Sequence, residues 1–69
     1  MTKSRLKTLA CFTETWRSLR FLMGVRDFDV GHLPYLLTRG LVEEGYCIDY
    51  RYRITERGKE ALAAVQSRP

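Results

Sequence analysis

The stretch from residue 33 to residue 62 constrains the fold most, because its hydrophobic period changes along the way. It opens with three leucines at helical spacing, which predict a helix with one apolar face: Leu33, Leu36 and Leu37. Gly40 follows, where a glycine can adopt the left-handed conformation that ends a helix. Because Pro34 is tolerated only in a first turn, we expect a short helix from near Gly31 to Arg39.

A period of two follows this helix. From Tyr46 to Ile54, apolar strand-forming residues alternate with polar ones, which is typical of a β-strand. We therefore predict a β-hairpin from Leu41 to Ile54, with a tight turn near Cys47 to Asp49. Thr55 then offers its hydroxyl to the first free amides of a last helix, and Glu56 lies at the positive end of that helix dipole.

The N-terminal part allows two interpretations, because no glycine or proline interrupts its apolar spacing of three and four. Residues Ser4 to Met23 can form one helix, or two helices broken near Phe12 with Thr13 as the cap of the second. In either case Ser4 is expected to cap the first helix and Gly24 to end the segment. We favour the break, because Thr13 offers a cap and is followed by an acid and a poor helix former.

A chain this small is expected to need its largest side chains in the core. We therefore predict that Phe12, Trp16 and Phe21 are buried. Gly58, in the first turn of the last helix, is best explained by close packing of that helix on the hairpin. Together these elements predict an α+β fold in a single domain, residues 1–69.

Composition bounds the class of protein. The formal net charge is +4, and nine of the twelve basic residues are arginines, which favours recognition of phosphate or carboxylate. Cys11 and Cys47 lack a paired spacing and the chain has one histidine, so we expect no zinc site and no disulfide. The sequence shows no nucleophile with a base and no phosphate loop, so we expect neither enzyme activity nor a cofactor. It shows no membrane-spanning segment, and we expect a cytoplasmic protein without a membrane partner.

Three motifs follow one another in the order of the predicted elements. Leu22 to Val25 (LMGV) has a glycine followed by an apolar residue, Thr38 to Gly45 (TRGLVEEG) leads from helix to hairpin, and Tyr52 to Leu62 (YRITERGKEAL) leads from hairpin to helix. In this order they resemble the turn, the wing entry and the wing closure of winged helix-turn-helix regulators of the MarR, PadR and ArsR kind. The resemblance covers Leu6 to Val65 and implies three N-terminal helices, a short β-hairpin wing and a C-terminal helix.

The resemblance also implies binding to double-stranded DNA, by a small transcriptional regulator or a phage or plasmid control protein. The helix near residues 31–39 would enter the major groove, and the wing at 41–54 would meet the backbone or the minor groove. Seven side chains would face the DNA: His32, Tyr35, Thr38, Arg39, Arg51, Arg53 and Arg57. The last three are expected to form a compact cationic patch.

A homodimer is expected as well, because operators usually contain two half-sites. The first and last helices offer more apolar area than so small a core can use, and we expect them to form the dimer surface. The residues concerned are Leu6, Leu9, Ala61, Ala64 and Val65.

Other interpretations of the hairpin remain open. Arg51 and Arg53 can bind phosphate, or they can pair with Glu43 and Glu44 across the two strands. The hairpin tyrosines can stack single-stranded bases, although we favour a buried or half-buried face: Tyr46, Tyr50 and Tyr52.

The alternative function is a winged-helix module that binds a protein, as an accessory or inhibitor of a larger nucleic-acid machine. Three observations favour it. The predicted recognition helix carries Pro34 near its start and has one strong cation on its exposed face, Arg39. Glu43 and Glu44 stand where the chain enters the wing.

Overall fold

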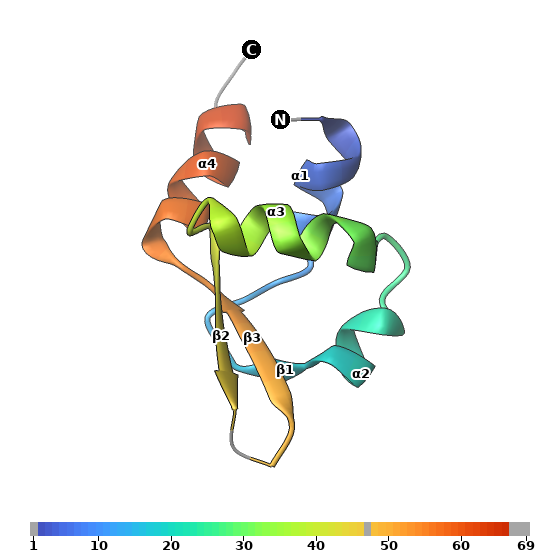
Figure 1. The fold of residues 1–69 in the computed structure, drawn as a ribbon. Coiled ribbons are helices and arrows are strands. Elements are labelled where there is room, and N and C mark those ends of the chain that lie inside the picture. The colour runs from blue at the N-terminus through green and yellow to red at the C-terminus, as the bar shows by residue number, and fades with distance from the viewer. Residues whose placement is uncertain (1, 47, 67–69) are drawn as a thin grey trace.

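The computed structural model describes residues 2–46 and 48–66. Within them the chain forms four α-helices, one 3₁₀ helix and a three-stranded antiparallel sheet, which confirms the predicted α+β class (Figure 1). The helices are α1 (Lys3–Leu9), α2 (Leu19–Met23), η1 (Val30–His32), α3 (Leu33–Thr38) and α4 (Glu56–Gln66). The strands are β1 (Arg17–Ser18), β2 (Val42–Tyr46) and β3 (Tyr50–Ile54). None of the helices in the described ranges has the length and apolar content needed to cross a bilayer.

The sheet has β3 in the middle, with β1 and β2 on either side. β2 and β3 form the predicted hairpin, in which Val42 pairs with Ile54 next to the core. The expected tight turn includes Cys47, which lies outside the described residues. β1 pairs with β3 through Arg17 opposite Tyr52. β1 could not be predicted from the sequence, because a two-residue strand is too short to show a period.

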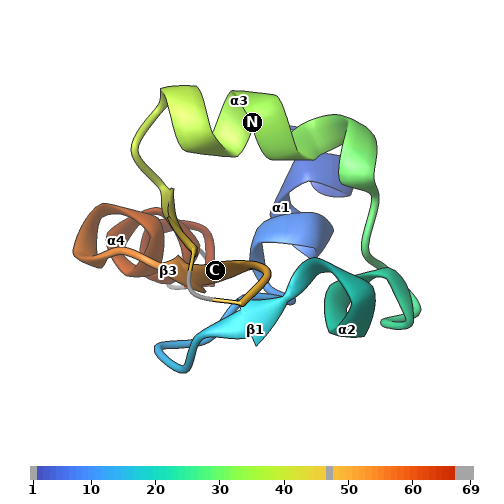
Figure 2. The same ribbon diagram turned by 60° about the horizontal axis from the view of Figure 1, so that its bottom comes forward.

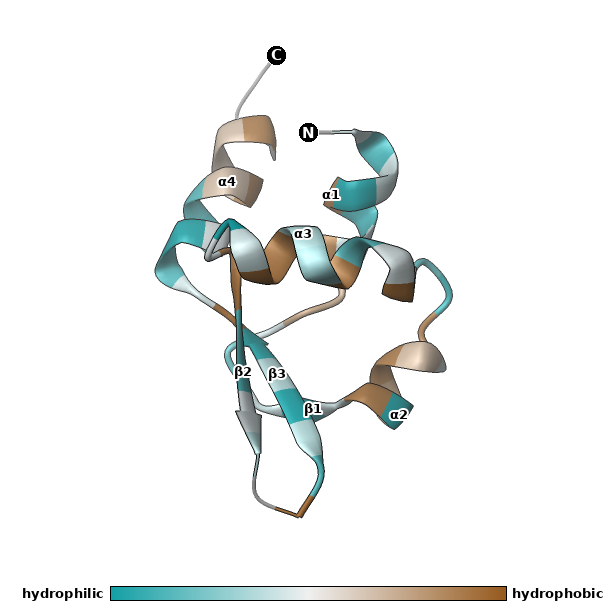
Figure 3. Cartoon of the chain, in the orientation of Figure 1, coloured by the Kyte–Doolittle hydropathy of each residue, from teal (hydrophilic) through white to brown (hydrophobic). Residues whose placement is uncertain are grey.

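The core lies where α3 and α1 meet the sheet. In Figure 2, α3 forms one side of the molecule, and β1 and α2 lie on the other. Brown segments of α3 alternate with pale and teal ones in Figure 3, as expected for a helix with one buried side. The buried hydrophobic residues are Leu9, Phe12, Leu22, Leu33, Leu36, Leu41, Val42, Tyr52 and Ile54.

The N-terminal part is broken, as favoured from the sequence, but neither predicted cap is correct. Thr2, not Ser4, caps α1, and its hydroxyl accepts a hydrogen bond of 3.2 Å from the amide of Arg5. Ser18, not Thr13, caps α2, with a bond of 3.2 Å from the amide of Phe21. The reason is tertiary, because the carbonyl of Thr13 accepts a hydrogen bond from Ile54, which holds this segment against the sheet.

The boundaries of α3 and α4 follow the prediction closely. Asp29 caps η1 by accepting a bond of 2.9 Å from the amide of Gly31, and α3 continues from it to Thr38. Gly40 has a φ of 71°, the left-handed conformation expected after a helix. The Thr55 hydroxyl accepts a bond of 3.1 Å from the amide of Gly58, so it caps α4 as predicted.

The aromatic residues are only partly in the core. Phe12 is buried, and its ring lies 5.8 Å from that of Phe28. Trp16 is 36% exposed and Phe21 51% exposed, so the prediction that both are core residues is wrong. The unpredicted strand β1 explains this difference, because it separates Trp16 from Phe21, which lies on α2, so the two residues do not share one helix face.

Candidate nucleic-acid interface

The outer side of α3 carries the first group of predicted DNA-binding residues. Leu33 and Leu36 are buried beneath the helix, so the opposite side faces outward. Thr38 and Arg39 are exposed there, as expected, whereas His32 and Tyr35 are half-buried. The predicted residues of this helix therefore differ in their accessibility to a ligand.

Tyr35 lies between two arginines. The guanidinium carbon of Arg5 is 4.0 Å from the centre of the tyrosine ring, and that of Arg39 is 5.2 Å away. Stacking of a cation on an aromatic ring contributes about 0.5 to 1 kcal/mol at an exposed site, so Tyr35 favours the observed positions of both guanidinium groups. Arg5 comes from α1 and was not among the residues predicted to face the DNA.

Arg57 continues this row from the start of α4. Its Nη1 atom donates a hydrogen bond of 3.4 Å to the carbonyl oxygen of Arg39. We call Arg5, Tyr35, Arg39 and Arg57 the α3 arginine row. Among the residues that the structure describes, none of its three guanidinium groups has a carboxylate within ion-pair distance. The row therefore keeps its positive charge available to an anionic partner.

His32 faces α1 instead of pointing away from the protein. Its Nε2 atom lies 2.7 Å from the hydroxyl oxygen of Ser4 and 3.6 Å from a carboxylate oxygen of Asp29. These contacts join the start of α3 to α1. His32 therefore makes polar contacts within the protein at the position where the prediction placed a contact with DNA.

The hairpin arginines lie on the sheet face that points away from the core. Arg53 forms an ion pair with Glu43 across the strands, which confirms one of the two pairings considered from the sequence. Arg51 instead donates from Nε to Asp49 at 2.9 Å. Arg57 extends toward α3, so the three arginines are not joined into the single compact patch that the sequence predicted.

Glu44 lies on the opposite face of the hairpin from Glu43. It stands across from Tyr52 in the sheet and is hydrogen-bonded to its hydroxyl. Burial is the main reason that the pKa of Tyr52 is raised to about 12, and the Glu44 hydrogen bond and charge add to the effect. Glu44 is therefore not the second cross-strand partner of an arginine.

The hairpin tyrosines differ in their exposure to solvent. Tyr52 is 4% exposed, which agrees with the favoured prediction of a buried face. Tyr46 and Tyr50 are 68% and 55% exposed, so the favoured prediction is wrong for these two residues, whose ring centres lie 4.9 Å apart. Because Tyr52 is buried, the three tyrosines do not form one stacking surface.

One of the residues expected to form the dimer surface on α1 and α4 is not available for it. Leu9 is fully buried in the core and cannot contact a second copy. Leu6 and Ala61 are half-buried, and Ala64 and Val65 are exposed. α1 and α4 do contact each other, at the end of the molecule where both termini lie (Figure 1).

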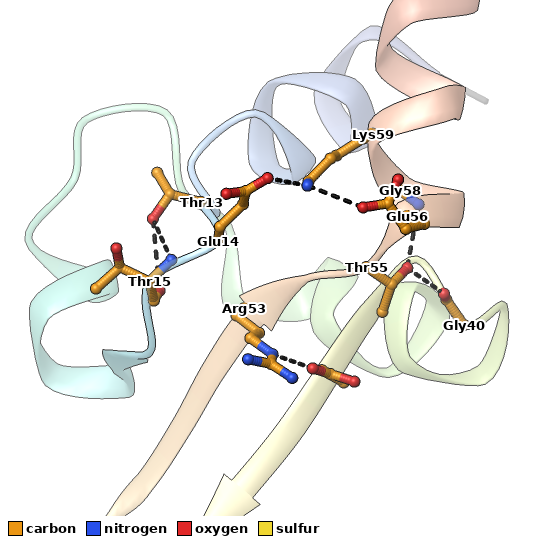
Figure 4. A network of polar contacts seen from close by, with 10 residues as sticks. Thr13, Glu14, Thr15, Gly40, Arg53, Thr55, Glu56, Gly58 and Lys59 are labelled. Atoms are coloured by element: carbon orange, nitrogen blue, oxygen red, sulfur yellow. Dashed lines mark hydrogen bonds and ion pairs between the residues drawn. The ribbon is translucent and has the colours of Figure 1, made fainter.

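A cavity of about 530 Å³ lies between the segment around Glu14 and the start of α4. Lys59 bridges Glu14 and Glu56 across it, and the Arg53 ion pair lies beside it (Figure 4). The hydrogen bond with Lys59 lowers the pKa of the Glu14 carboxyl, and the same bond raises the pKa of the Lys59 ammonium. Three carboxylates and two cations line this cavity, so its net charge is negative and the site does not attract DNA.

Cys11 is half-buried, and its thiol donates to the carbonyl of Lys7 at 3.2 Å. Burial, with a smaller contribution from the Asp27 charge, raises the pKa of this thiol. Cys47 lies outside the described residues, so the structure does not test whether the two cysteines form a disulfide.

The structure therefore brings three of the seven predicted residues together, Tyr35, Arg39 and Arg57, and adds Arg5 from α1. Sequence spacing could not reveal Arg5, because it reaches the site through the packing of α1 against α3. Comparison of the chain with protein-family models, with curated proteins and with solved structures found no match.

Proposed function

We propose that this protein binds double-stranded DNA as a winged helix-turn-helix domain, with α3 as the recognition helix and the β2–β3 hairpin as the wing. The α3 arginine row is the observation that carries the proposal. Three guanidinium groups lie beside a short helix: Arg5 comes from α1 and is half-buried, and Arg39 at the end of α3 and Arg57 from α4 are exposed. Such a surface suits the phosphate oxygens on either side of a groove.

The order of the elements supports the same proposal. A first helix, a short strand, two helices, a hairpin and a last helix follow one another, and β1 pairs with the hairpin strand β3. In this arrangement α3 stands at the surface while the hairpin extends to one side of it (Figure 1). A helix and a hairpin presented together can occupy a major groove and the adjoining backbone or minor groove.

The residues of α3 would then divide their roles. Arg39 is exposed and can reach guanine edges or phosphate, and Thr38 beside it can donate to phosphate. Arg5 and Arg57 come from other helices and would contact the backbone. Arg51 and Arg53 would need to exchange their carboxylate partners for phosphate, which makes the wing the weaker part of the surface.

A small domain that presents this surface fits the function of a transcriptional regulator, or of a phage or plasmid control protein. A homodimer would place two copies of α3 on two half-sites. Val65, 43% exposed on α4, together with Ala64 and the half-buried Leu6 and Ala61, would supply the contact.

A protein-binding module is the second candidate, and the exposed apolar side chains favour it. Phe21 and Met23 on α2 are 51% and 59% exposed, and Ile48 at the hairpin turn is 83% exposed. Side chains of this kind are enriched at the centres of protein interfaces. This candidate predicts association that depends weakly on salt.

Fluorescence anisotropy with a random-sequence duplex separates the two candidates. The DNA proposal predicts micromolar binding at low salt that weakens steeply at moderate salt, because counterions are released on binding. The Arg51→Gln/Arg53→Gln variant should bind duplex DNA more weakly than the native protein does. Arg39→Gln should have the lowest affinity of the three. Absence of binding at low salt would contradict the DNA proposal and direct the search toward a protein partner.

A further inference from the structure

The Trp16 indole lies across the outer face of the sheet. Trp16 precedes β1, and the pairing of Arg17 with Tyr52 places it next to Arg53 on β3. The guanidinium carbon of Arg53 is 4.5 Å from the indole centre. On β2, a Cβ atom added to Gly45 would lie 3.0 Å from two carbons of the indole. The ring therefore reaches over β3 and rests against Gly45, where any larger residue would have a tight contact with the indole.

A cavity of about 270 Å³ opens beside this ring. Trp16, Gly45, Tyr46 and Arg51 line it. Trp16 is 36% exposed, so part of the indole is accessible to a ligand. The cavity thus combines an aromatic surface, a close approach to the backbone and a guanidinium group.

We propose that Trp16, Gly45 and Arg51 form a binding site for one nucleobase with its phosphate, with the base stacked on the indole and the phosphate bound by Arg51. Every base offers a π-face to an aromatic side chain, and stacking on such a side chain is a common basis of single-strand binding. The ligand can be a free mononucleotide or an unpaired base of a strand, because both present the same base and phosphate.

The charges around the cavity suit a phosphate that binds with moderate affinity. Arg51 donates to Asp49 from Nε, and a guanidinium group has five donors in a planar fork that can serve a carboxylate and a phosphate together. Arg53 is paired with Glu43 and stacks on the indole, so it positions Trp16 and is not itself assigned to the phosphate.

This site is separate from the α3 arginine row, and the inference does not depend on duplex binding. The row lies along α3, whereas Trp16 and Arg51 lie on the sheet face that points away from the core. Arg39→Gln should leave nucleotide binding unchanged, whereas Arg51→Gln should also weaken duplex binding slightly, because Arg51 is part of the proposed wing.

Trp16 is the single tryptophan of the chain, so its fluorescence reports on the site directly. The full-length protein would be titrated with AMP, with ribose 5-phosphate and with a short single-stranded oligodeoxyadenylate, using excitation where adenine does not absorb. We expect saturable quenching by AMP or by the oligonucleotide, and none by ribose 5-phosphate, which lacks a base. Quenching by AMP identifies free nucleotides as a source, and quenching by the oligonucleotide alone identifies unpaired bases of a strand.

Three variants test the roles of the charges. Arg51→Gln should weaken binding about tenfold or more, as loss of a charge-assisted hydrogen bond does. Arg26→Gln removes an exposed arginine from the connector after α2 and should leave the affinity unchanged. Asp49→Asn should tighten binding, because it removes the carboxylate that competes for Arg51.

Two results would overturn the inference. One is the absence of saturable quenching by both AMP and the oligonucleotide while circular dichroism shows a folded protein. The other is equal affinity of the native protein and Arg51→Gln. As an independent measurement, Trp16→Leu should lose binding to a fluorescently labelled nucleotide, and full retention of that binding would also contradict the site.

Discussion

The hydroxyl of Thr55 donates a hydrogen bond of 2.6 Å to the carbonyl oxygen of Gly40 (Figure 4). The same hydroxyl accepts a bond of 3.1 Å from the amide of Gly58 at the start of α4. One side chain therefore joins the end of α3 to the beginning of α4. This connection holds Arg39 and Arg57 near each other, since Arg39 precedes Gly40 and Arg57 follows Thr55 by two residues.

Replacement of Thr55 should show how much this connection stabilises the fold. Thr55→Ala removes both hydrogen bonds and should lower the free energy of unfolding by about 1 to 2 kcal/mol, the usual cost of losing a helix cap. Thr55→Ser keeps the hydroxyl and should retain most of the stability. Urea denaturation followed by circular dichroism measures both variants. Equal stability of Thr55→Ala and the native protein would show that the cap contributes nothing.

Gly58 should tolerate no side chain. A Cβ atom there would collide with the carbonyl oxygen of Leu41 and lie 2.6 Å from Cγ1 of Ile54. Gly58→Ala should therefore lower the free energy of unfolding by about 2 to 3 kcal/mol, as overpacking of a close contact does. Gly24→Ala is the matched control, because a Cβ at Gly24 meets its nearest atom at 3.4 Å and φ there is −85°. A loss of stability as large in the control as in Gly58→Ala would contradict this explanation.

Alkaline pH should destabilise the protein through Tyr52. Its pKa is about 12 in the folded state, above the ordinary value of 10. Between these values the unfolded state loses the proton first, so the contribution of Tyr52 is complete below pH 10 and is lost as pH rises toward 12. The loss should amount to roughly 2 kcal/mol.

Tyr52→Phe is the control for this effect, because it removes the titrating group and keeps the ring. Its stability should fall less between these pH values than that of the native protein in the same urea titrations. Phenolate absorbance of the native protein should also show a component near pH 12 that Tyr52→Phe lacks. A native profile identical to that of Tyr52→Phe would contradict the assignment.

Much of the C-terminal half could be predicted because its signals are local. The roles of Gly40, Thr55 and Gly58 could be predicted because each residue lies next to a helix end, and the structure confirms all three roles. In the N-terminal half several residues of similar chemistry compete to cap a helix. The choice of Ser18 over Thr13 depends on the hydrogen bond from Ile54, which lies far along the chain.

The candidate site was less predictable than the fold. Helical spacing was sufficient to place Thr38 and Arg39 on the exposed side of α3. It could not show that His32 turns toward Ser4, or that Arg5 from α1 stacks on Tyr35, because both contacts join helices that are distant in sequence. Trp16 was assigned to the core for its size alone, and its place beside Gly45 requires the strand β1.

The contribution of α1 to DNA binding is the part of the account that depends most on the structure. Arg5 and Arg39 stack on the same ring, so each should contact a phosphate or base edge in the complex. Arg5→Gln should therefore weaken duplex binding as much as Arg39→Gln does. Tyr35→Leu, which removes the ring between them, should weaken it as well, because the guanidinium groups lose their fixed positions.

The salt dependence of duplex binding in these variants tests the account most directly. The logarithm of the association constant should fall linearly with the logarithm of the salt concentration, and each lost phosphate contact should reduce the slope by about 0.9. The account predicts a reduced slope for Arg5→Gln and the native slope for Arg26→Gln, which changes the net charge equally outside the row. A native slope and affinity in Arg5→Gln, or duplex binding that does not respond to salt, would contradict it.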